Sequence, residues 1–251
     1  MIKPAFACAL ACSAVLACAL SFAPVARAQD FGASTWSDQD LEDHASPERF
    51  TWELRLGTYT PNTGGSAFTQ VFPGDSGPMV ALELDAHIVR IPYLGILGLG
   101  VSAGWARYSG RSCTTSGGTL VCPTGSAADS SGEKAKLSLF PISTMAVLRI
   151  DALARELDIP FVFTGKLGLD TIFFHSTTGS RTDGKGHSLG LRWGVQVALE
   201  LDFLDMHAAR ALDEDWGINH SFLFFELYGS TANSTLPLGD RTFAAGLGMT
   251  F

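Results

Sequence analysis

The sequence predicts an all-β protein: a closed, antiparallel, eight-stranded, up-and-down transmembrane β-barrel. Three observations favour this fold. Eight segments alternate apolar and polar residues with a period of two, long polar connections alternate with short ones, and 46% of the chain is apolar while only 17% is charged. No run of ~18 apolar residues follows residue 28, so a spanning helix is not expected in that part of the chain.

The N-terminal residues resemble a secretory signal peptide. Lys3 precedes an apolar run from Ala5 to about Ala23, and Ala26-Arg27-Ala28 forms an A-x-A cleavage site before Gln29. We therefore predict a cleaved signal at residues 1–28, an acidic periplasmic segment at residues 29–49 and the transmembrane β-barrel at residues 50–251. A membrane anchor, or a lipoprotein signal with lipid on Cys18, are the alternatives.

The net charge of the chain limits the kinds of partner that it is expected to bind. The whole chain carries a net charge of −8, and without residues 1–28 it has 15 basic and 25 acidic residues. Such a chain is not expected to bind nucleic acid or to present a polybasic patch to lipids. Cys113 and Cys122 are the two cysteines left after cleavage, and they bracket a short polar stretch. In an exported chain they predict a disulfide that closes an outer loop.

The strands follow one another with little interruption. The first is the clearest, since Phe50, Trp52 and Leu54 alternate with Glu53 and Arg55. The predicted strands are residues 49–61, 78–90, 96–108, 134–150, 160–175, 189–204, 218–229 and 240–251. The fourth contains Pro141, which cannot donate a ladder hydrogen bond and predicts a bulge or bend.

The connections differ at the two ends of the predicted barrel. Polar loops are expected at 61–77, 109–133, 176–188 and 230–239. The links at the other end are a tight turn at 91–95, a helical turn at 151–159 and a link at 205–217 with a short helix through 208–212. Outer-membrane barrels have this asymmetry, with short turns on the periplasmic side and long loops outside. We therefore expect the loops to face the exterior and to offer a surface for an extracellular ligand.

The alternation does not by itself show which face of each strand contacts water, because a soluble barrel has the same alternation with its apolar side chains inside. Two patterns favour lipid outside: paired charges on the glycine-rich faces, and aromatic residues at two levels. The proposed pairs are Lys166 with Glu200, Asp170 with Arg192, and Arg55 with Glu83. The predicted lumen charges are Glu53, Arg55, Glu83, Asp85, Lys166, Asp170, Arg192, Glu200, Asp202 and Glu226. The predicted aromatic girdles are Phe50, Trp52, Phe161, Phe163, Phe203 and Phe251 at the terminal side, and Tyr59, Trp105, Phe173, Trp193 and Phe243 at the loop side.

The chain resembles small bacterial outer-membrane β-barrel proteins, in its signal peptide, its eight alternating strands and its final Phe251. Shorter stretches look similar to an uncharacterised barrel family known from myxobacteria. The resemblance implies a location in the outer membrane, contact with outer-membrane lipids, and recognition of Phe251 by the barrel-assembly machinery. It implies no activity. The matching stretches are Ser46-Pro47, Trp52-Glu53-Leu54-Arg55-Leu56-Gly57, Leu139-Phe140-Pro141-Ile142, Leu201-Asp202-Phe203-Leu204-Asp205, Gly217-Ile218-Asn219-His220 and Phe224-Phe225-Glu226.

No constellation of residues predicts catalysis, a cofactor or a metal site. Residues 179–186 approach a phosphate-binding loop, but Gly186 replaces the hydroxyl residue and the flanks are strands. The pair His220-Ser221 lies on one strand, where adjacent side chains point to opposite faces. The sequence therefore favours a structural or surface-interaction barrel that is not an enzyme. A narrow ion or solute channel and a membrane-embedded lipid-modifying enzyme remain as alternatives, and the sequence does not indicate the oligomeric state.

Overall fold

A computed structural model of the chain describes residues 47–63, 68, 71–72, 76–112, 114–116, 119–121, 133–157 and 159–251. The described residues belong to one compact unit, Ala45–Phe251. The predicted signal peptide, residues 29–46 of the acidic segment, and Cys113 and Cys122 lie outside the described residues.

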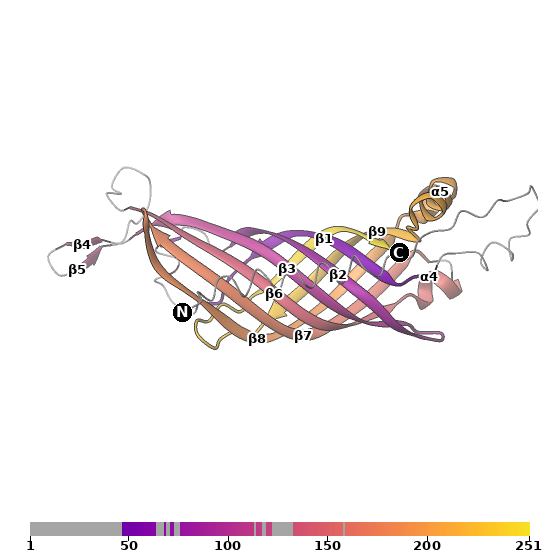
Figure 1. Cartoon of the computed structure of the whole chain (residues 1–251), viewed down its shortest axis with the longest axis horizontal. Helices are drawn as coiled ribbons and strands as arrows, with labels where there is room; N and C mark the ends of the chain where they lie inside the picture. Colours follow the sequence, from indigo (N-terminus) through magenta and orange to yellow (C-terminus); the bar gives the residue numbers. More distant parts are fainter. Residues whose placement is uncertain are drawn as a thin grey trace, which may run out of the picture. The chain divides into compact units, whose positions relative to one another are not determined.

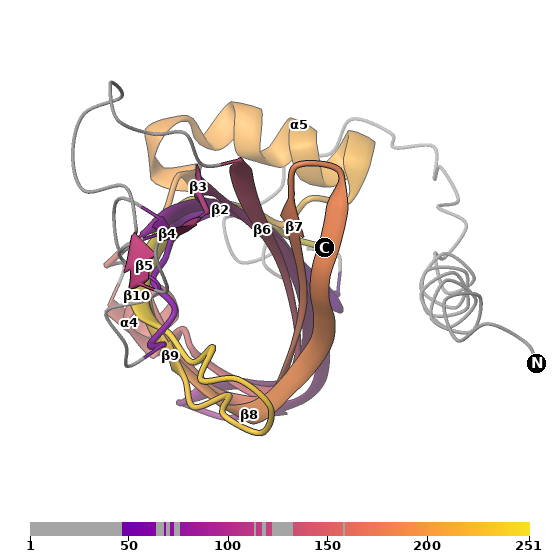
Figure 2. The same cartoon turned by 90° about the vertical axis from the view of Figure 1, so that its left-hand side faces the viewer.

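Eight long strands close into a barrel (Figures 1 and 2). Neighbouring strands are antiparallel throughout, in the order β1-β10-β9-β8-β7-β6-β3-β2. The predicted closed, eight-stranded, up-and-down barrel is therefore confirmed. Its strands are β1 (Phe50–Tyr59), β2 (Gly77–Ile91), β3 (Gly95–Arg111), β6 (Lys134–Ile150), β7 (Phe161–Thr178), β8 (Arg181–Glu200), β9 (His220–Ser230) and β10 (Arg241–Thr250).

The period-two alternation of each strand divides it between two environments. Most charged side chains in the middle of the strands point into the barrel and are at most 6% exposed, whereas many large apolar side chains on the outer face are 38% to 64% exposed. A soluble barrel has the opposite arrangement, so the outer face meets lipid and the barrel is transmembrane. The outer residues in this range include Leu56, Val80, Leu82, Leu99, Val101, Leu167, Leu169, Leu191, Val195, Leu223, Phe225 and Leu247.

Two predicted segments differ from the structure. Residues 176–188 do not form a loop: β7 and β8 continue to a two-residue turn at Gly179, whose φ of +59° suits glycine. Residues 201–204 do not continue the sixth predicted strand but turn away as a 3₁₀ helix, η1 (Asp202–Leu204). Side-chain alternation alone does not show where a strand leaves its ladder.

Pro141 does not produce the predicted bulge. The register between β3 and β6 is the same on both sides of it, with Ala103 opposite Ile142 and Ala106 opposite Leu139. Gly104 makes this possible, because a Cβ there would lie 3.1 Å from the proline ring. The register shifts occur instead in β2, between His87 and Val89, and at the end of β7.

The two ends of the barrel carry different connections. The predicted helical links are present as α4 (Ala152–Leu157) and α5 (Met206–Trp216), at the end where β1 begins and β10 finishes (Figure 1). A small hairpin of β4 (Thr114–Ser116) and β5 (Thr119–Val121) lies at the other end. Among the described residues, no helix combines the length and apolar character needed to cross a bilayer. We call the two ends the terminal end and the loop end.

Candidate functional site

Two cations hold the centre of the lumen together. The Arg55 Nη2 atom lies 2.5, 2.9 and 2.7 Å from carboxylate oxygens of Glu53, Glu83 and Glu226. The Lys166 Nζ atom lies 3.0, 2.5 and 3.5 Å from the same three side chains. Each charge comes from strand β1, β2, β7 or β9, so the cluster links opposite walls of the barrel. Because all five side chains are buried, these ion pairs act at low dielectric, and losing one partner would leave a buried charge uncompensated.

Small residues make room for this cluster. Glu53 and Glu83 are directly opposite each other across β1 and β2, and the shared cations offset the repulsion between these two like charges. A Cβ on Gly194 would lie 2.6 Å from a Glu226 carboxylate oxygen, and one on Gly100 would lie 2.2 Å from Asp85 Oδ1. Gly100 and Gly194 are therefore places where a charged side chain from a neighbouring strand packs.

The proposed ion pairs are only partly those that form. Arg55 does reach Glu83, but Lys166 does not pair with Glu200, which lies at the terminal end and accepts a hydrogen bond from Arg149 Nη2 at 3.0 Å. Asp170 and Arg192 meet through Ser143, whose hydroxyl donates to Asp170 at 2.8 Å and lies 3.4 Å from Arg192 Nη1.

Asp202 is also displaced from its predicted position. It lies in η1, outside the strands, and is half-buried rather than in the lumen. Its Oδ2 atom lies 2.6 Å from His220 Nδ1, and its Oδ1 accepts from the Ser221 backbone N–H at 3.3 Å. In the described structure Ser221 thus meets this acid through its backbone, not through its hydroxyl.

Apolar side chains close the lumen at the loop end, which the sequence did not lead us to expect. Phe68 and Phe72, from the predicted polar loop 61–77, pack against Tyr108 with ring-centroid distances of 5.5 and 6.2 Å, and their own ring centroids are 5.0 Å apart. Tyr59 does not join a lipid-facing girdle: it is 1% exposed and donates to the Leu238 carbonyl at 2.6 Å. We call this layer the loop-end cap; it comprises Tyr59, Phe72, Met79, Ala106, Tyr108, Ala135, Leu137, Leu139, Ile172, Tyr228, Ala232, Leu238 and Ala244, with Phe68 and Val71 against it.

A second apolar layer and an ion-pair network close the terminal end. Val162, Ala198, Phe222 and Phe224 are buried there, below the central charges. Arg149 lies over the Phe222 ring, 4.9 Å from its centroid. The charged centre of the lumen is therefore bounded by apolar residues on both sides.

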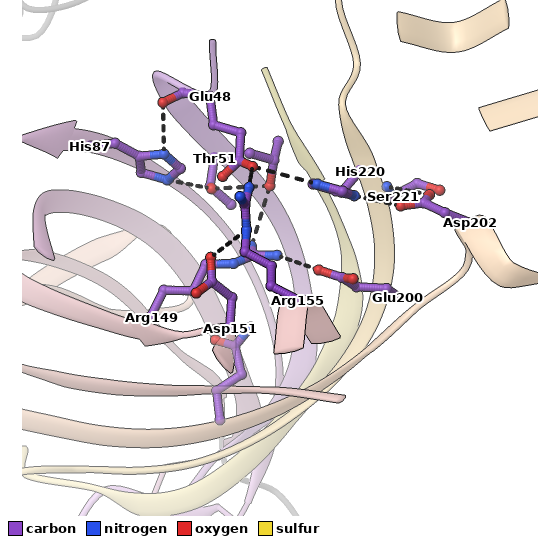
Figure 3. Close-up of polar contacts among 12 residues, drawn as sticks. Glu48, Thr51, His87, Arg149, Asp151, Arg155, Glu200, Asp202, His220 and Ser221 are labelled. Atoms are coloured by element: carbon purple, nitrogen blue, oxygen red, sulfur yellow. Dashed lines mark hydrogen bonds and ion pairs between the residues drawn. The ribbon is translucent and has the colours of Figure 1, made fainter. Parts of the chain in front are cut away.

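Glu48, just before β1, is the hub of the terminal-end network (Figure 3). It accepts hydrogen bonds from Arg155 and from Arg90 Nη2, the latter at 2.9 Å, and lies 3.5 Å from His220 Nε2. Asp151 pairs with the same two arginines, at 2.8 Å from Arg90 and 3.3 Å from Arg155. Burial alone would raise the pKa of Glu48, but the hydrogen bond to His220 and the charges of Arg155 and Arg90 lower it to about 2.

Among the residues that the structure describes, two groups of side chains have the composition of a metal site. Ligand atoms of Glu200, Asp202 and His220 lie within 4.8 Å of one another, as do those of Glu53, Glu83 and Asp85. The first group already engages Arg149 and the Ser221 backbone, and Arg55 and Lys166 already neutralise much of the second. These partners compete with a bound cation in both places.

A recess of about 830 Å³ lies at the loop end, between residues 60–63 and the β9–β10 connection. Its lining offers hydroxyl, amide, indole and ionic groups, among them Thr60, Asn62, Trp193, Asn233, Asp240 and Arg241. Burial raises the pKa of Asp240 to about 7, although hydrogen bonds from the Thr60 and Arg241 backbone and from Tyr228 oppose the rise. The recess therefore holds a carboxyl group that changes charge near neutral pH.

No protein-family model matches the chain, and no curated protein matches it. Solved structures that resemble it include the attachment invasion locus protein Ail of Yersinia pestis, with 10% identity, a TM-score of 0.44, and coverage of 81% of this chain and 99% of that one. Neisserial surface protein A has 12% identity, a TM-score of 0.45, and coverage of 80% and 96%. The N-terminal β-barrel domain of Pseudomonas aeruginosa OprF has 8% identity, a TM-score of 0.41, and coverage of 81% and 98%.

All three are small outer-membrane β-barrel proteins. None of them supports the resemblance to a family from myxobacteria. At these identities and TM-scores, no ligand or activity transfers from them to this chain. What the site does has to follow from its own geometry.

Proposed function

We propose that this chain is an outer-membrane barrel with a structural and surface-interaction role, whose loop end meets a ligand while its lumen serves as a packed core. One observation carries the proposal: the lumen is filled by ion pairs between two apolar layers, whereas a recess of about 830 Å³ opens at the loop end. That volume lies within the usual range for binding pockets.

The orientation in the membrane is part of the proposal. Tight or helical links and the start of β1 share the terminal end. The connections after β1, β3 and β9 share the loop end with the two-residue β7–β8 turn. We assign the terminal end to the periplasm, together with residues 29–49, and the loop end to the cell exterior. Export through a cleaved signal at residues 1–28 and recognition of Phe251 by the barrel-assembly machinery complete this assignment.

The chemistry of the recess favours a hydroxyl-rich ligand. Amide, hydroxyl and carboxyl groups there can exchange hydrogen bonds with a sugar, and Trp193 offers an aromatic surface. The sugars of the lipopolysaccharide layer surround the outer end of such a barrel. A disulfide between Cys113 and Cys122, which we also propose, would stiffen the neighbouring loop against this layer.

Cysteine labelling on intact cells tests the orientation. Lys185→Cys lies near the turn of the β7–β8 hairpin and Arg210→Cys lies in α5, and both positions are exposed. A membrane-impermeant maleimide should label the first and not the second. The unsubstituted chain is the control, and its lack of labelling is expected if Cys113 and Cys122 are paired. Labelling of Arg210→Cys alone would reverse the orientation and refute the surface role.

Conductance and binding test the function. The purified protein in planar bilayers should show no stable conductance steps, because apolar layers bound the charged lumen. Tryptophan emission should change on titration with lipopolysaccharide and with its lipid-free core oligosaccharide, and Asn233→Ala should weaken both responses. Regular conductance steps would favour the channel alternative. A response to lipopolysaccharide alone would place the ligand in the lipid and not in the sugar.

A further inference from the structure

Helix α5 and the residues just before it expose large apolar side chains at the terminal end. Trp216 is 74% exposed and Leu212 is 37% exposed, and in η1 Phe203 and Leu204 are 54% and 68% exposed. These residues lie outside the strand faces that form the lipid-facing belt. Water would be an unfavourable surrounding for so many large apolar groups in one place.

The helix is well formed and two-sided. Asp205 caps its first turn, accepting hydrogen bonds from the backbone N–H groups of His207 and Ala208, and Gly217 ends it in the left-handed conformation with φ +67°. At 100° per residue, Ala208, Ala209, Leu212 and Trp216 fall on one side, whereas Arg210, Ala211 and Glu214 fall on the other, and Asp215 borders the apolar side next to Ala208.

The barrel covers little of the apolar side. Within the described structure, α5 contacts η1 and the start of β9. Ala209 and Asp213 are half-buried, and the other helix residues whose burial is described are exposed. The contact with the barrel therefore uses the edge of the helix and leaves Leu212 and Trp216 open.

The helix lies crosswise to the barrel axis. Figure 1, with the barrel axis nearly horizontal, shows α5 end-on beside the terminal end. Figure 2, turned by 90°, shows it from the side, running across the rim outside the ring of strands. Because the barrel axis crosses the membrane, α5 lies roughly parallel to the membrane plane.

Other exposed apolar residues mark the terminal end. Tyr93, in the β2–β3 turn, is 86% exposed, and Leu157, at the end of α4, is 60% exposed. Phe161, the first residue of β7, continues this set into the lipid-facing belt. Tyrosine and tryptophan are enriched where acyl chains meet headgroups, which places this rim at the bilayer interface.

We propose that η1 and α5 form an interfacial anchor, in which Phe203, Leu204, Leu212 and Trp216 enter the periplasmic leaflet beside the barrel. The partner is a lipid surface of low negative charge, because the acidic residues Asp213, Glu214 and Asp215 of α5 outnumber Arg210 and would be repelled by anionic headgroups. The inference rests on the proposed membrane orientation of the barrel, and it adds a second lipid contact to the strand belt.

Quenching by brominated lipid tests the anchor. The chain has five tryptophans, and we would keep either Trp216 or Trp105 as the only one, replacing the other four by phenylalanine. Trp105 lies on the outer face of β3 and reports barrel insertion. In phosphatidylcholine vesicles with bromine near the headgroup end of the acyl chains, the emission of both reporters should be quenched. In vesicles with bromine near the ends of the acyl chains, the emission of Trp216 should be quenched less.

Two matched substitutions locate the face of the helix that meets lipid. In the Trp216 reporter, Leu212→Asp should remove most of the quenching, whereas Ala211→Asp, which adds the same charge on the water-facing side, should leave it unchanged. Heat-modifiable migration checks that each variant is folded. Quenching of Trp105 without quenching of Trp216, or equal effects of the two substitutions, would overturn the anchor and leave the barrel intact. Absence of quenching in both reporters would overturn the membrane barrel as well.

Discussion

Replacing Lys166 by methionine removes one of the two cations at the centre of the lumen while keeping a side chain of similar length. Four carboxylates, those of Glu53, Glu83, Asp85 and Glu226, then face Arg55 alone. A charge pair near 3 Å is worth about 5 kcal/mol before desolvation at an effective dielectric of about 20. Desolvation offsets much of this, and breaking a buried pair generally costs roughly 3–5 kcal/mol. We expect Lys166→Met to lower the free energy of unfolding by that amount.

Equilibrium unfolding by urea in phosphatidylcholine vesicles measures this loss. Lys136→Met is the matched control, because Lys136 is exposed on β6, and its cost should stay within about 0.5 kcal/mol. Adding Glu226→Gln to Lys166→Met should restore about 1 kcal/mol or more, because it removes an acid that has lost its partner. A cost below about 1 kcal/mol for Lys166→Met, or no coupling with Glu226, would refute the view that these ion pairs hold the lumen together.

Three further perturbations test other parts of the structure. Leu167→Arg, at a lipid-facing position that is 64% exposed, should cost ~2–4 kcal/mol in vesicle unfolding, whereas Leu201→Arg, beyond the end of β8, should cost ~0–1 kcal/mol. Glu48→Gln should cost on the order of 1 kcal/mol at pH 7, since two of its partners are partly exposed. Because the pKa of Glu48 is lowered from 4.5 to about 2, this difference from the unsubstituted chain should be constant above pH 4.5 and vanish as the pH falls toward 2. Asp240→Asn should stabilise the barrel at pH 8, where the buried Asp240 carboxylate is charged in the folded chain. The gain should shrink progressively below pH 7, because the raised pKa of Asp240 makes the folded state bind the proton more tightly than the unfolded chain. Equal pH profiles for the two chains would contradict this.

The regular part of the barrel is the part that the sequence predicts well. Alternation with a period of two places Glu53 and Arg55 on one face and Leu54 and Leu56 on the other, and the register in the structure follows it. The pairing of Arg55 with Glu83 is also predictable, because β1 and β2 are consecutive and antiparallel. Both inferences use only the geometry of neighbouring strands.

Contacts across the lumen are much harder to predict. Lys166 finds Glu53 and Glu83 on the far wall of the barrel, a pairing that depends on barrel closure and strand stagger and not on neighbouring register. Phe68 and Phe72 stand out in an otherwise polar loop, and this was the available signal that the loop packs into the mouth. At Leu201 the sequence pattern misleads in the other direction, because the alternation of apolar and polar residues continues past Glu200, where the strand ends.

The loop-end cap connects the closed lumen to the proposed surface role. Tyr108 donates its hydroxyl hydrogen bond to the Tyr59 carbonyl, and Tyr59 donates to the carbonyl of Leu238 in the β9–β10 connection. Tyr228, in the same cap, donates to Asp240, which also lines the recess. A ligand that binds in the recess therefore contacts residues fixed by the cap, and little ordering entropy is lost on binding. Residues of the cap that bound the lumen thus also hold the recess in shape, so opening the cap should weaken ligand binding at the surface as well.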